Sequence, residues 1–281
     1  MNVKRVFVSG ATGYIGTLVS ERLVSSGIEL IIGGKNISNL HLMQRKLLMI
    51  NPNLEIQVST YDLNNENTWE QAANFVTSKN IDSYVNCSGI QGTIKPSLEL
   101  NISEIDMAMR INLYSSVYFT NFFTKNISPV KPLRIIHFSG GGAAKPRPYF
   151  LPYSLSKTSL IRFVENFSIE NPNVYINAIA PGLLPSKMQT EILDSEIPHS
   201  SEDFIAASKV QKNIEIKNEK ILQLCEFLLS SESDGISGRL ISAHWDNWKE
   251  WPEHLDELIN SDLYTVRRII GKDRNVGWGD I

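Results

Sequence analysis

The stretch VKRVFVSGATGYIG, residues 3–16, determines the fold that the sequence predicts. Val3 to Ser9 is mostly apolar, which indicates a buried strand. Glycines follow at positions 10, 13 and 16, and a helical apolar stripe then continues to about Ser25. A dinucleotide-binding loop needs this order of strand, glycine-rich turn and helix, because glycine lets the backbone approach a pyrophosphate and the helix N-terminus offers free amides. A purely structural turn is the alternative.

Strands and helices alternate along the rest of the chain. Further strands are predicted at 29–32, 54–61, 84–89, 133–138, 174–180 and 238–243, and helices at 38–50, 65–78, 103–125, 219–229 and from about 152. Such alternation implies a parallel sheet with right-handed crossovers. We therefore expect an α/β fold with a doubly wound, mostly parallel sheet of seven strands and helices on both faces.

Composition narrows the class of protein. The chain has 281 residues, is 42% hydrophobic and 20% charged, and carries a net charge of -3, which argues against a general nucleic-acid binder. No apolar run is long enough for a membrane span, and the chain enters a strand pattern at once, without a signal peptide. Cys87 and Cys225 lie in apolar patterns and are expected to be buried thiols. We expect a cytoplasmic protein without a metal site or membrane partner.

Polar and small residues follow several of the predicted strands. Gly10, Lys35, Asp62 and residues 86–89 all lie at strand ends, and ligands of such sheets bind beyond the carboxyl ends of the strands. Lys35 follows the second strand, where an acid would bind the ribose hydroxyls of NAD. A lysine there favours NADP(H) over NAD(H), with an ordinary loop lysine as the alternative.

A second motif lies in PYSLSKTSLIRF, residues 152–163. On a helix, Tyr153 and Lys157 share one face at about 6 Å. A neighbouring ammonium stabilises a phenolate and lowers the pKa of the phenol. The pair can therefore exchange a proton near neutral pH. Taken alone, such a pair is more often a packed tyrosine and a solvated lysine.

Together these motifs resemble the short-chain dehydrogenase/reductase family, in its single-domain branch with a Rossmann fold, over residues 3–243. The motifs follow the family's order and approximate spacing. The matching positions are the glycine loop, Asp62-Leu63, Asn86-Cys87-Ser88-Gly89, Asn112, Ser139, Tyr153, Lys157, Pro181-Gly182 and Ser186.

The resemblance implies roles for four catalytic residues. Tyr153 would be the general acid for carbonyl reduction and the base for alcohol oxidation, and Lys157 would lower its pKa and hold the nicotinamide ribose. Ser139 would bind the substrate oxygen, and Asn112 would hold a water in the proton relay. The expected cofactor contacts are Gly10, Thr12, Gly13, Tyr14, Ile15, Gly16, Lys35, Asn36, Asp62, Leu63, Asn86, Cys87, Ser88, Gly89, Tyr153, Lys157, Pro181, Gly182 and Ser186.

The sequence departs from the family pattern in three places. The spacing of the glycines is the form of the sugar-nucleotide-modifying branch. Ser139 lies fourteen residues before Tyr153, one more than usual, and Gly140 takes the second place of the common serine pair. The chain also continues beyond the last strand. We expect one domain over residues 1–243, with a substrate lid of weakly regular structure at 183–215, and an extension at 244–281 packed on the same domain.

The extension carries Trp245, Trp248 and Trp251, for which packing or a subunit contact is favoured over a pocket lining. Arg147 lies beside the active-site loop and would suit a phosphate or carboxylate, with a surface arginine as the commoner alternative.

The predicted function is that of an NADP(H)-dependent oxidoreductase that interconverts a carbonyl and a secondary alcohol, on a sugar or sugar nucleotide. The alternatives are a 3-oxoacyl thioester reductase, a nucleotide-sugar epimerase or dehydratase with tightly bound NAD, and a non-catalytic NADP-binding sensor. As is common in the family, a homodimer or homotetramer is expected.

Overall fold

Seven parallel strands form one sheet in the computed structural model, which describes residues 4–127, 132–212 and 218–278. The strands are β1 (Arg5–Ser9), β2 (Glu29–Gly34), β3 (Ile56–Thr60), β4 (Ser83–Asn86), β5 (Leu133–Phe138), β6 (Val174–Ala180) and β7 (Leu240–Ser242). Their order is β3-β2-β1-β4-β5-β6-β7, and every neighbouring pair is parallel. This confirms the predicted fold class. The strand order reverses between β1 and β4, which is the point where such sheets bind ligands.

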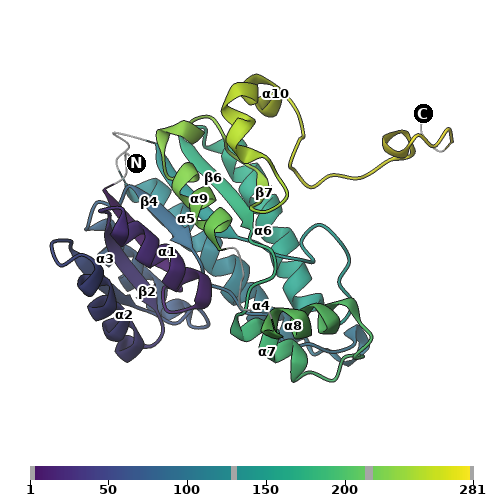
Figure 1. Cartoon of the computed structure of the whole chain (residues 1–281), viewed down its shortest axis with the longest axis horizontal. Coiled ribbons are helices and arrows are strands. Elements are labelled where there is room, and N and C mark those ends of the chain that lie inside the picture. Colours follow the sequence, from purple (N-terminus) through teal and green to yellow (C-terminus); the bar gives the residue numbers. More distant parts are fainter. Residues whose placement is uncertain (1–3, 128–131, 213–217, 279–281) are drawn as a thin grey trace.

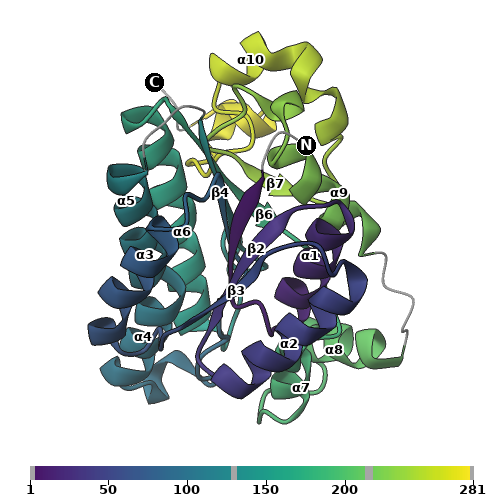
Figure 2. The ribbon, with the colours of Figure 1, turned by 90° about the vertical axis from the view of Figure 1, so that its left-hand side faces the viewer.

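Helices cover both faces of the sheet (Figures 1 and 2). One face carries α1 (Tyr14–Ser25), α2 (Ile37–Ile50) and α9 (Glu219–Leu228), and the other carries α3 (Trp69–Thr77), α4 (Ile102–Met109), α5 (Ser115–Asn126) and α6 (Leu151–Glu170). Short 3-10 turns lie at Glu66–Thr68, Ser97–Glu99, Ser231–Ser233, Trp248–His254 and Gly271–Arg274. None of the helices in the described ranges is long and apolar enough to cross a bilayer.

The core lies in two layers because successive side chains of a strand point to opposite faces. In β1, Val6 and Val8 pack in the layer that contains Val19 of α1, whereas Phe7 packs in the opposite layer. The Phe7 ring stacks on Tyr84 at a centroid distance of 5.3 Å. Both faces of β1 are buried, as expected for a parallel sheet covered by helices.

The long helix predicted at 103–125 is interrupted by a π-helical turn at Arg110–Tyr114, between α4 and α5. Asn112 lies within this turn and is buried. Single π-turns inside α-helices are rare and occur frequently at functional sites. A periodicity near 3.6 residues cannot indicate such an inserted residue, so the sequence predicted one regular helix.

The predicted lid region is more regular than expected. It contains α7 (Lys187–Leu193) and α8 (Glu202–Lys212), which lie together beyond the carboxyl ends of the strands (Figure 2). Glu202 and Asp203 occupy the first turn of α8, where acidic side chains interact favourably with the helix dipole. The expectation of weakly regular structure was therefore wrong for this part. Residues 213–215 of the predicted lid lie outside the described residues, as do Val3 and residues 279–281.

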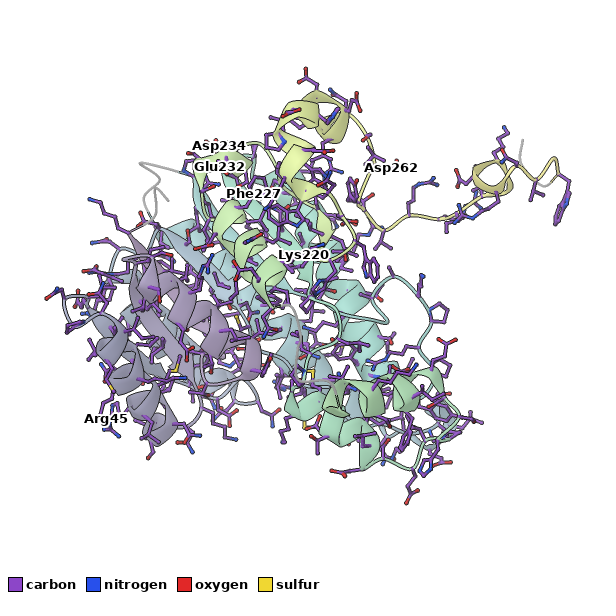
Figure 3. The ribbon with its side chains drawn as sticks, in the orientation of Figure 1. Arg45, Lys220, Phe227, Glu232, Asp234 and Asp262 are labelled. Atoms are coloured by element: carbon purple, nitrogen blue, oxygen red, sulfur yellow. The ribbon has the colours of Figure 1, made fainter. Side chains whose placement is uncertain are left out.

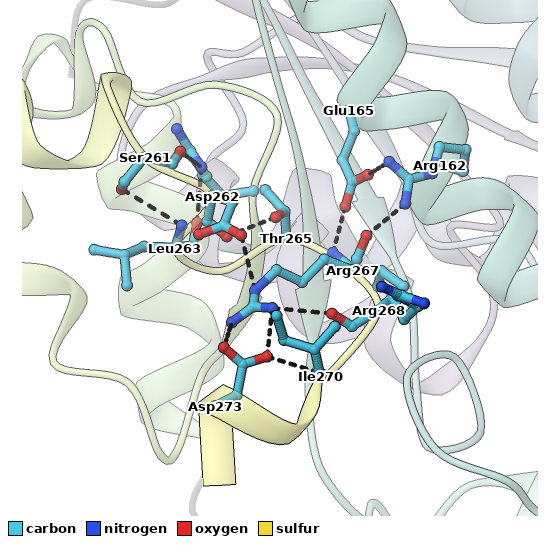
Figure 4. Close-up of polar contacts among 12 residues, drawn as sticks. Arg162, Glu165, Ser261, Asp262, Leu263, Thr265, Arg267, Arg268, Ile270 and Asp273 are labelled. Atoms are coloured by element: carbon cyan, nitrogen blue, oxygen red, sulfur yellow. Dashed lines mark hydrogen bonds and ion pairs between the residues drawn. The ribbon is translucent and has the colours of Figure 1, made fainter. Parts of the chain in front are cut away.

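The extension has two parts. Trp248 and Trp251 are buried in the layer that contains Phe227 of α9, whereas Trp245 is 86% exposed. After α10 (Leu255–Ile259) and Asp262, which is labelled in Figure 3, Tyr264 still accepts a backbone hydrogen bond from Leu240 of β7 at 2.9 Å. The chain then leaves the body (Figure 1). Figure 4 shows how its base is held: the backbone amide of Val266 donates to Glu165 of α6 at 2.7 Å.

Candidate active site

The glycine loop between β1 and α1 has the shape that a dinucleotide requires. Gly10 has a φ of +68°, and a Cβ there would approach the Ser88 amide nitrogen at 2.8 Å. A Cβ at Gly16 would overlap the carbonyl of Gly10. Gly13 is the N-cap of α1, without a side-chain cap and without an acid in the first turn. The N-terminus of α1 is therefore open to a phosphate group.

A cavity of about 250 Å³ lies at the carboxyl edge of the sheet, beside this loop. Its walls come from the ends of β4, β5 and β6, from α6 and from the segment that contains α7 and α8. The lining residues are Ile15, Cys87, Ser88, Gly89, Gln91, Phe138, Ser139, Gly140, Gly141, Arg147, Tyr153, Lys157, Pro181, Gly182, Leu183, Leu184, Ser186, Met188, Gln189 and Asp203. Three of the four predicted catalytic residues thus line one cavity, together with predicted contacts of the nicotinamide end.

Tyr153 and Lys157 are both buried on successive turns of α6. The Lys157 Nζ lies 5.9 Å from the centroid of the Tyr153 ring and donates a hydrogen bond to the carbonyl oxygen of Phe138 at 2.7 Å. Burial disfavours the charged ammonium and lowers the pKa of Lys157 to about 8. The lysine is still mostly protonated at neutral pH.

The pKa of Tyr153 is raised above its ordinary value because the phenol is buried. The positive charge of Arg147 acts in the opposite direction. The sequence led us to expect that Lys157 lowers this pKa. In the structure burial dominates, and Arg147 is the cation that partly offsets it.

Ser139 lines the cavity with Tyr153, and the next residue, Gly140, lies against the Tyr153 hydroxyl. A Cβ at Gly140 would overlap the Tyr153 hydroxyl, so a serine does not fit there in this conformation. Ser139 is buried, and its Oγ has no hydrogen-bond partner in the part of the chain that the structure describes.

The side chain of Asn112 makes its hydrogen bonds to other residues of the protein. Its Nδ2 donates to the Ile90 carbonyl oxygen and to Ser156 Oγ, each at 2.9 Å, and its Oδ1 accepts from the Ile90 amide at 2.9 Å. Ser156 in turn donates to the Tyr153 carbonyl oxygen at 2.8 Å. These contacts fix α6 and the segment after β4 relative to one another, and the predicted water in a proton relay stays a prediction.

The residues expected at the adenosine end lie outside the cavity. Lys35 pairs with Asp62 at 2.8 Å, and its side chain is 75% exposed. Partial burial acts to raise the pKa of Asp62, but hydrogen bonds from Lys35 and the Asn64 backbone lower it overall. Asn36 accepts a hydrogen bond from the Asn39 amide as the cap of α2. A phosphate on the adenosine ribose would thus lie near an exposed lysine that can leave Asp62 and bind the phosphate instead.

Other predicted contacts have structural partners. Asn86 donates to Ser116 and accepts from the Ser88 amide, and Tyr14 accepts from Asn218 at 3.0 Å. Leu63 packs beside the core layer of α3 and α5. Thr12 is exposed in the glycine loop.

Sequence reasoning missed three polar residues of the cavity and misjudged a fourth. Gln91, Gln189 and Asp203 line the cavity but carry no motif that marks them. Arg147 is not a surface arginine: its side chain is 13% exposed, its guanidinium stacks 3.7 Å from the centroid of the Phe150 ring, and it pairs with Asp203 at 2.8 Å. Of these residues, only Gln91 could have been identified as a candidate cavity residue from the sequence, because it lies just after the end of a strand.

Comparisons with known proteins agree with this geometry. The family model for short chain dehydrogenase matches residues 4–197. The chain is 23% identical to an (S)-acetoin-forming diacetyl reductase of Staphylococcus epidermidis, over 85% of this chain and 96% of that protein. It is also 23% identical to the NADPH-dependent reductase BacG of Bacillus subtilis, over 89% and 99% of the two chains. The crystal structure of levodione reductase matches with a TM-score of 0.75 at 19% identity, over 89% and 98% of the two chains.

A doubly wound parallel sheet with an open glycine loop and a buried tyrosine–lysine pair at its carboxyl edge is the arrangement that the resemblance to this family predicted. The family model covers well over half of the sequence. The chain therefore belongs to the short-chain dehydrogenase family, and it is a dehydrogenase or reductase of the kind that uses NAD or NADP.

Proposed function

We propose that this protein interconverts a carbonyl group and a secondary alcohol, with NADP(H) as the cofactor and Tyr153 as the group that gives or takes the proton. One observation carries the proposal. Tyr153 and Lys157 are buried one helical turn apart in a cavity beside the open glycine loop. A proton donor is useful there because negative charge develops on the substrate oxygen during carbonyl reduction.

The residues of this chain fit a nicotinamide dinucleotide. The glycine loop and the N-terminus of α1 would hold the diphosphate, and Pro181, Gly182 and Ser186 would border the nicotinamide. When bound, the cofactor supplies or accepts the hydride. Lys157 would hold its ribose.

The substrate side uses other groups of the cavity. Tyr153 would donate its proton to the substrate oxygen in reduction and accept it in oxidation. Ser139, which lines the cavity, would orient that oxygen through its hydroxyl, as the resemblance to the family implies. Asn112 would keep Ile90 and Ser156 in place, and the predicted relay water would lie beside it.

Two observations support NADP(H) over NAD(H). Lys35 lies at the end of β2, where its exposed ammonium can turn to a 2′-phosphate. BacG, one of the relatives, is named an NADPH-dependent reductase. The spacing of Gly10, Gly13 and Gly16 further supports a sugar or sugar nucleotide as the substrate.

We also propose that the protein works as a homodimer or homotetramer, as members of this family commonly do. A reducing cytoplasm suits Cys87 and Cys225, which are both free thiols.

The test is NADPH oxidation by the purified protein over a panel of carbonyl compounds, with Tyr153→Phe as the variant. We expect at least one carbonyl to be reduced, and Tyr153→Phe to lower kcat by about 10²–10⁴-fold while NADPH still binds. Tyr264→Phe is the matched control, because Tyr264 lies in the extension, with its ring packed against Trp251 at a tilt of 35°. Tight NADPH binding without turnover of any carbonyl would favour a sensor, and co-purified NAD without net cofactor turnover would favour an epimerase.

A further inference from the structure

One buried histidine has no role in the proposed reaction but is hydrogen-bonded to residues around the active site. His137 lies on β5, is 0% exposed, and directly precedes Phe138, whose carbonyl oxygen accepts the hydrogen bond of Lys157. Burial disfavours the charged imidazolium, and the positive charge of Lys157 acts in the same direction, so the pKa of His137 is lowered to about 3. The imidazole is therefore neutral at the pH values where most histidines titrate.

The hydrogen bonds of Asn86 determine which nitrogen of this imidazole carries the proton. Asn86 Oδ1 accepts from the Ser88 amide at 3.1 Å, which fixes the orientation of the side-chain amide. Its nitrogen donates to Ser116 Oγ at 2.8 Å and lies 3.2 Å from His137 Nδ1. Nδ1 must accept there, so the proton of the neutral ring lies on Nε2. Nε2 therefore donates to Thr120 Oγ1 of α5 at 3.1 Å.

Asn86 connects this imidazole to two parts of the active site. Its Oδ1 holds the backbone amide of Ser88, which lines the cavity beside the glycine loop. Its nitrogen binds Ser116, whose hydroxyl donates to the Asn112 carbonyl oxygen at 2.9 Å, and Asn112 Nδ2 donates to Ser156 of α6 at 2.9 Å. The side chains of Asn86, Ser116, Asn112 and Ser156 belong to residues no more than 3% exposed, so water does not readily replace a lost partner.

We propose that His137 is a positioning residue of the active site, which as a neutral acceptor and donor joins Asn86 to α5 and so holds the cavity edge at Ser88 in place. This inference rests on the proposed carbonyl–alcohol chemistry and adds a residue that acts through Asn86. A side chain without both functions leaves the Asn86 amide and the Thr120 hydroxyl unpaired away from water. The segments that carry them then shift toward other partners, and the cavity edge shifts with them.

Variants of β5 separate positioning from stability. His137→Leu has a similar volume and removes both nitrogens, whereas His137→Gln retains one acceptor and one donor. We expect His137→Leu to lower kcat/KM and NADPH affinity by about tenfold or more, because small displacements at a reacting centre are costly, and His137→Gln to recover most of both. Ile135→Val is the matched control: Ile135 is buried on the same face of β5, so its shortening should lower stability without changing either constant.

The kinetic and stability measurements together decide the role of the residue. If His137→Leu is less stable in denaturant unfolding but retains wild-type kcat/KM and NADPH affinity, as Ile135→Val should, the role is purely structural and the inference is wrong. Equal losses in His137→Leu and His137→Gln would also contradict it, because the hydrogen bonds would then not matter.

Nitrogen NMR of wild type, labelled at its five histidines, tests the inference without turnover. The His137 signals are those lost in His137→Gln. Lys157 of α6 and Tyr84 of β4, whose ring lies at 5.8 Å, are the titratable groups that act on the ring or pack against it. We expect a neutral ring with its proton on Nε2 between about pH 5 and pH 8.

An imidazolium in this range, or a proton on Nδ1, would overturn the inference. The expected tautomer and the expected loss of NADPH affinity in His137→Leu, in a protein that reduces no carbonyl, would instead count against the proposed reaction alone.

Discussion

Two ion pairs of equal length border the carboxyl edge of the sheet, and they differ in burial. Arg147 and Asp203 approach to 2.8 Å with side chains 13% and 26% exposed. Lys35 and Asp62 also approach to 2.8 Å, but the lysine side chain is 75% exposed. An exposed pair contributes about 0–1 kcal/mol and can exchange partners readily. In a buried pair, removal of one partner leaves a desolvated charge, which is far more costly.

This difference indicates what each pair does. Lys35 can leave Asp62 for a cofactor phosphate at little cost, so the exposed pair suits ligand selection. Arg147 instead joins the loop before α6 to α8 of the lid, and its charge acts on Tyr153. Equal distances between charged atoms therefore do not imply equal function.

Lys157 is a buried cation without a carboxylate partner and so differs from both ion pairs. Of the changes considered, its removal should have the largest effect on activity. We expect Lys157→Met to lower kcat/KM by about 10²–10⁴-fold, because the variant lacks the ammonium that, in the proposed mechanism, holds the ribose and supports proton transfer. The fold should persist, since a methionine fills similar space and removes a desolvated charge. Near-normal rates in this variant would contradict the mechanism.

The same variant tests the lowered pKa of Lys157 through protein stability. The pKa is about 8 in the folded state and 10.5 in the unfolded chain. Between these values the unfolded state binds more protons, so stability rises with pH in this window and the penalty is complete below pH 8. From pH 8 to pH 10, wild type should gain about 2 kcal/mol relative to Lys157→Met in denaturant unfolding. A constant difference between the two proteins would show that Lys157 is not desolvated.

Breaking the buried pair should shift the pH profile in two opposite directions. The charged residues that line the cavity with Tyr153 are Lys157 on α6, Arg147 on the preceding loop and Asp203 on α8. Arg147→Met removes a cation and raises the pKa of the phenol, so the alkaline decline of carbonyl reduction should move to higher pH. Asp203→Asn leaves the positive charge of Arg147 without its carboxylate partner and lowers the pKa of the phenol. The alkaline decline of carbonyl reduction should then move to lower pH. A purely structural role of the pair predicts lower activity in both variants with no opposite shifts.

Breaking the exposed pair of Lys35 and Asp62 should have the smallest effect. We expect it to change the relative affinities for NADPH and NADH and to leave turnover nearly unchanged. We expect NADPH to bind wild type at least tenfold more tightly than NADH, which corresponds to about 1.4 kcal/mol. Lys35→Ala should bring the two dissociation constants close together with little change in kcat, and Asp62→Asn should widen the ratio. Equal affinities in wild type, or a preference for NADH, would refute the role of Lys35.

The fold was predictable from the sequence because β1 and the glycine loop are local features. The bounds of β5 and β6, at 133–138 and 174–180, agree with the expectation because both strands are short segments rich in isoleucine and other apolar residues. The π-turn around Asn112 and the helices α7 and α8 were not predictable, because they depend on side-chain contacts that lie far apart in the sequence.

The candidate site was predictable only where its residues belong to motifs. Tyr153 and Lys157 are four residues apart on one helix, so their proximity follows from spacing alone. Gln91, Gln189 and Asp203 meet only through tertiary structure. The raised pKa of Tyr153 also escaped prediction, because burial of the phenol is not visible in a local pattern.

The most direct test is a crystal structure with NADPH and a substrate analogue, in which the distance from Tyr153 Oη to the ligand oxygen is measured. We predict about 2.6–3.2 Å, the range of a proton-transferring hydrogen bond, with the nicotinamide C4 facing the same carbon. A phenol turned away from the ligand, or separated from the nicotinamide by protein, would contradict the account.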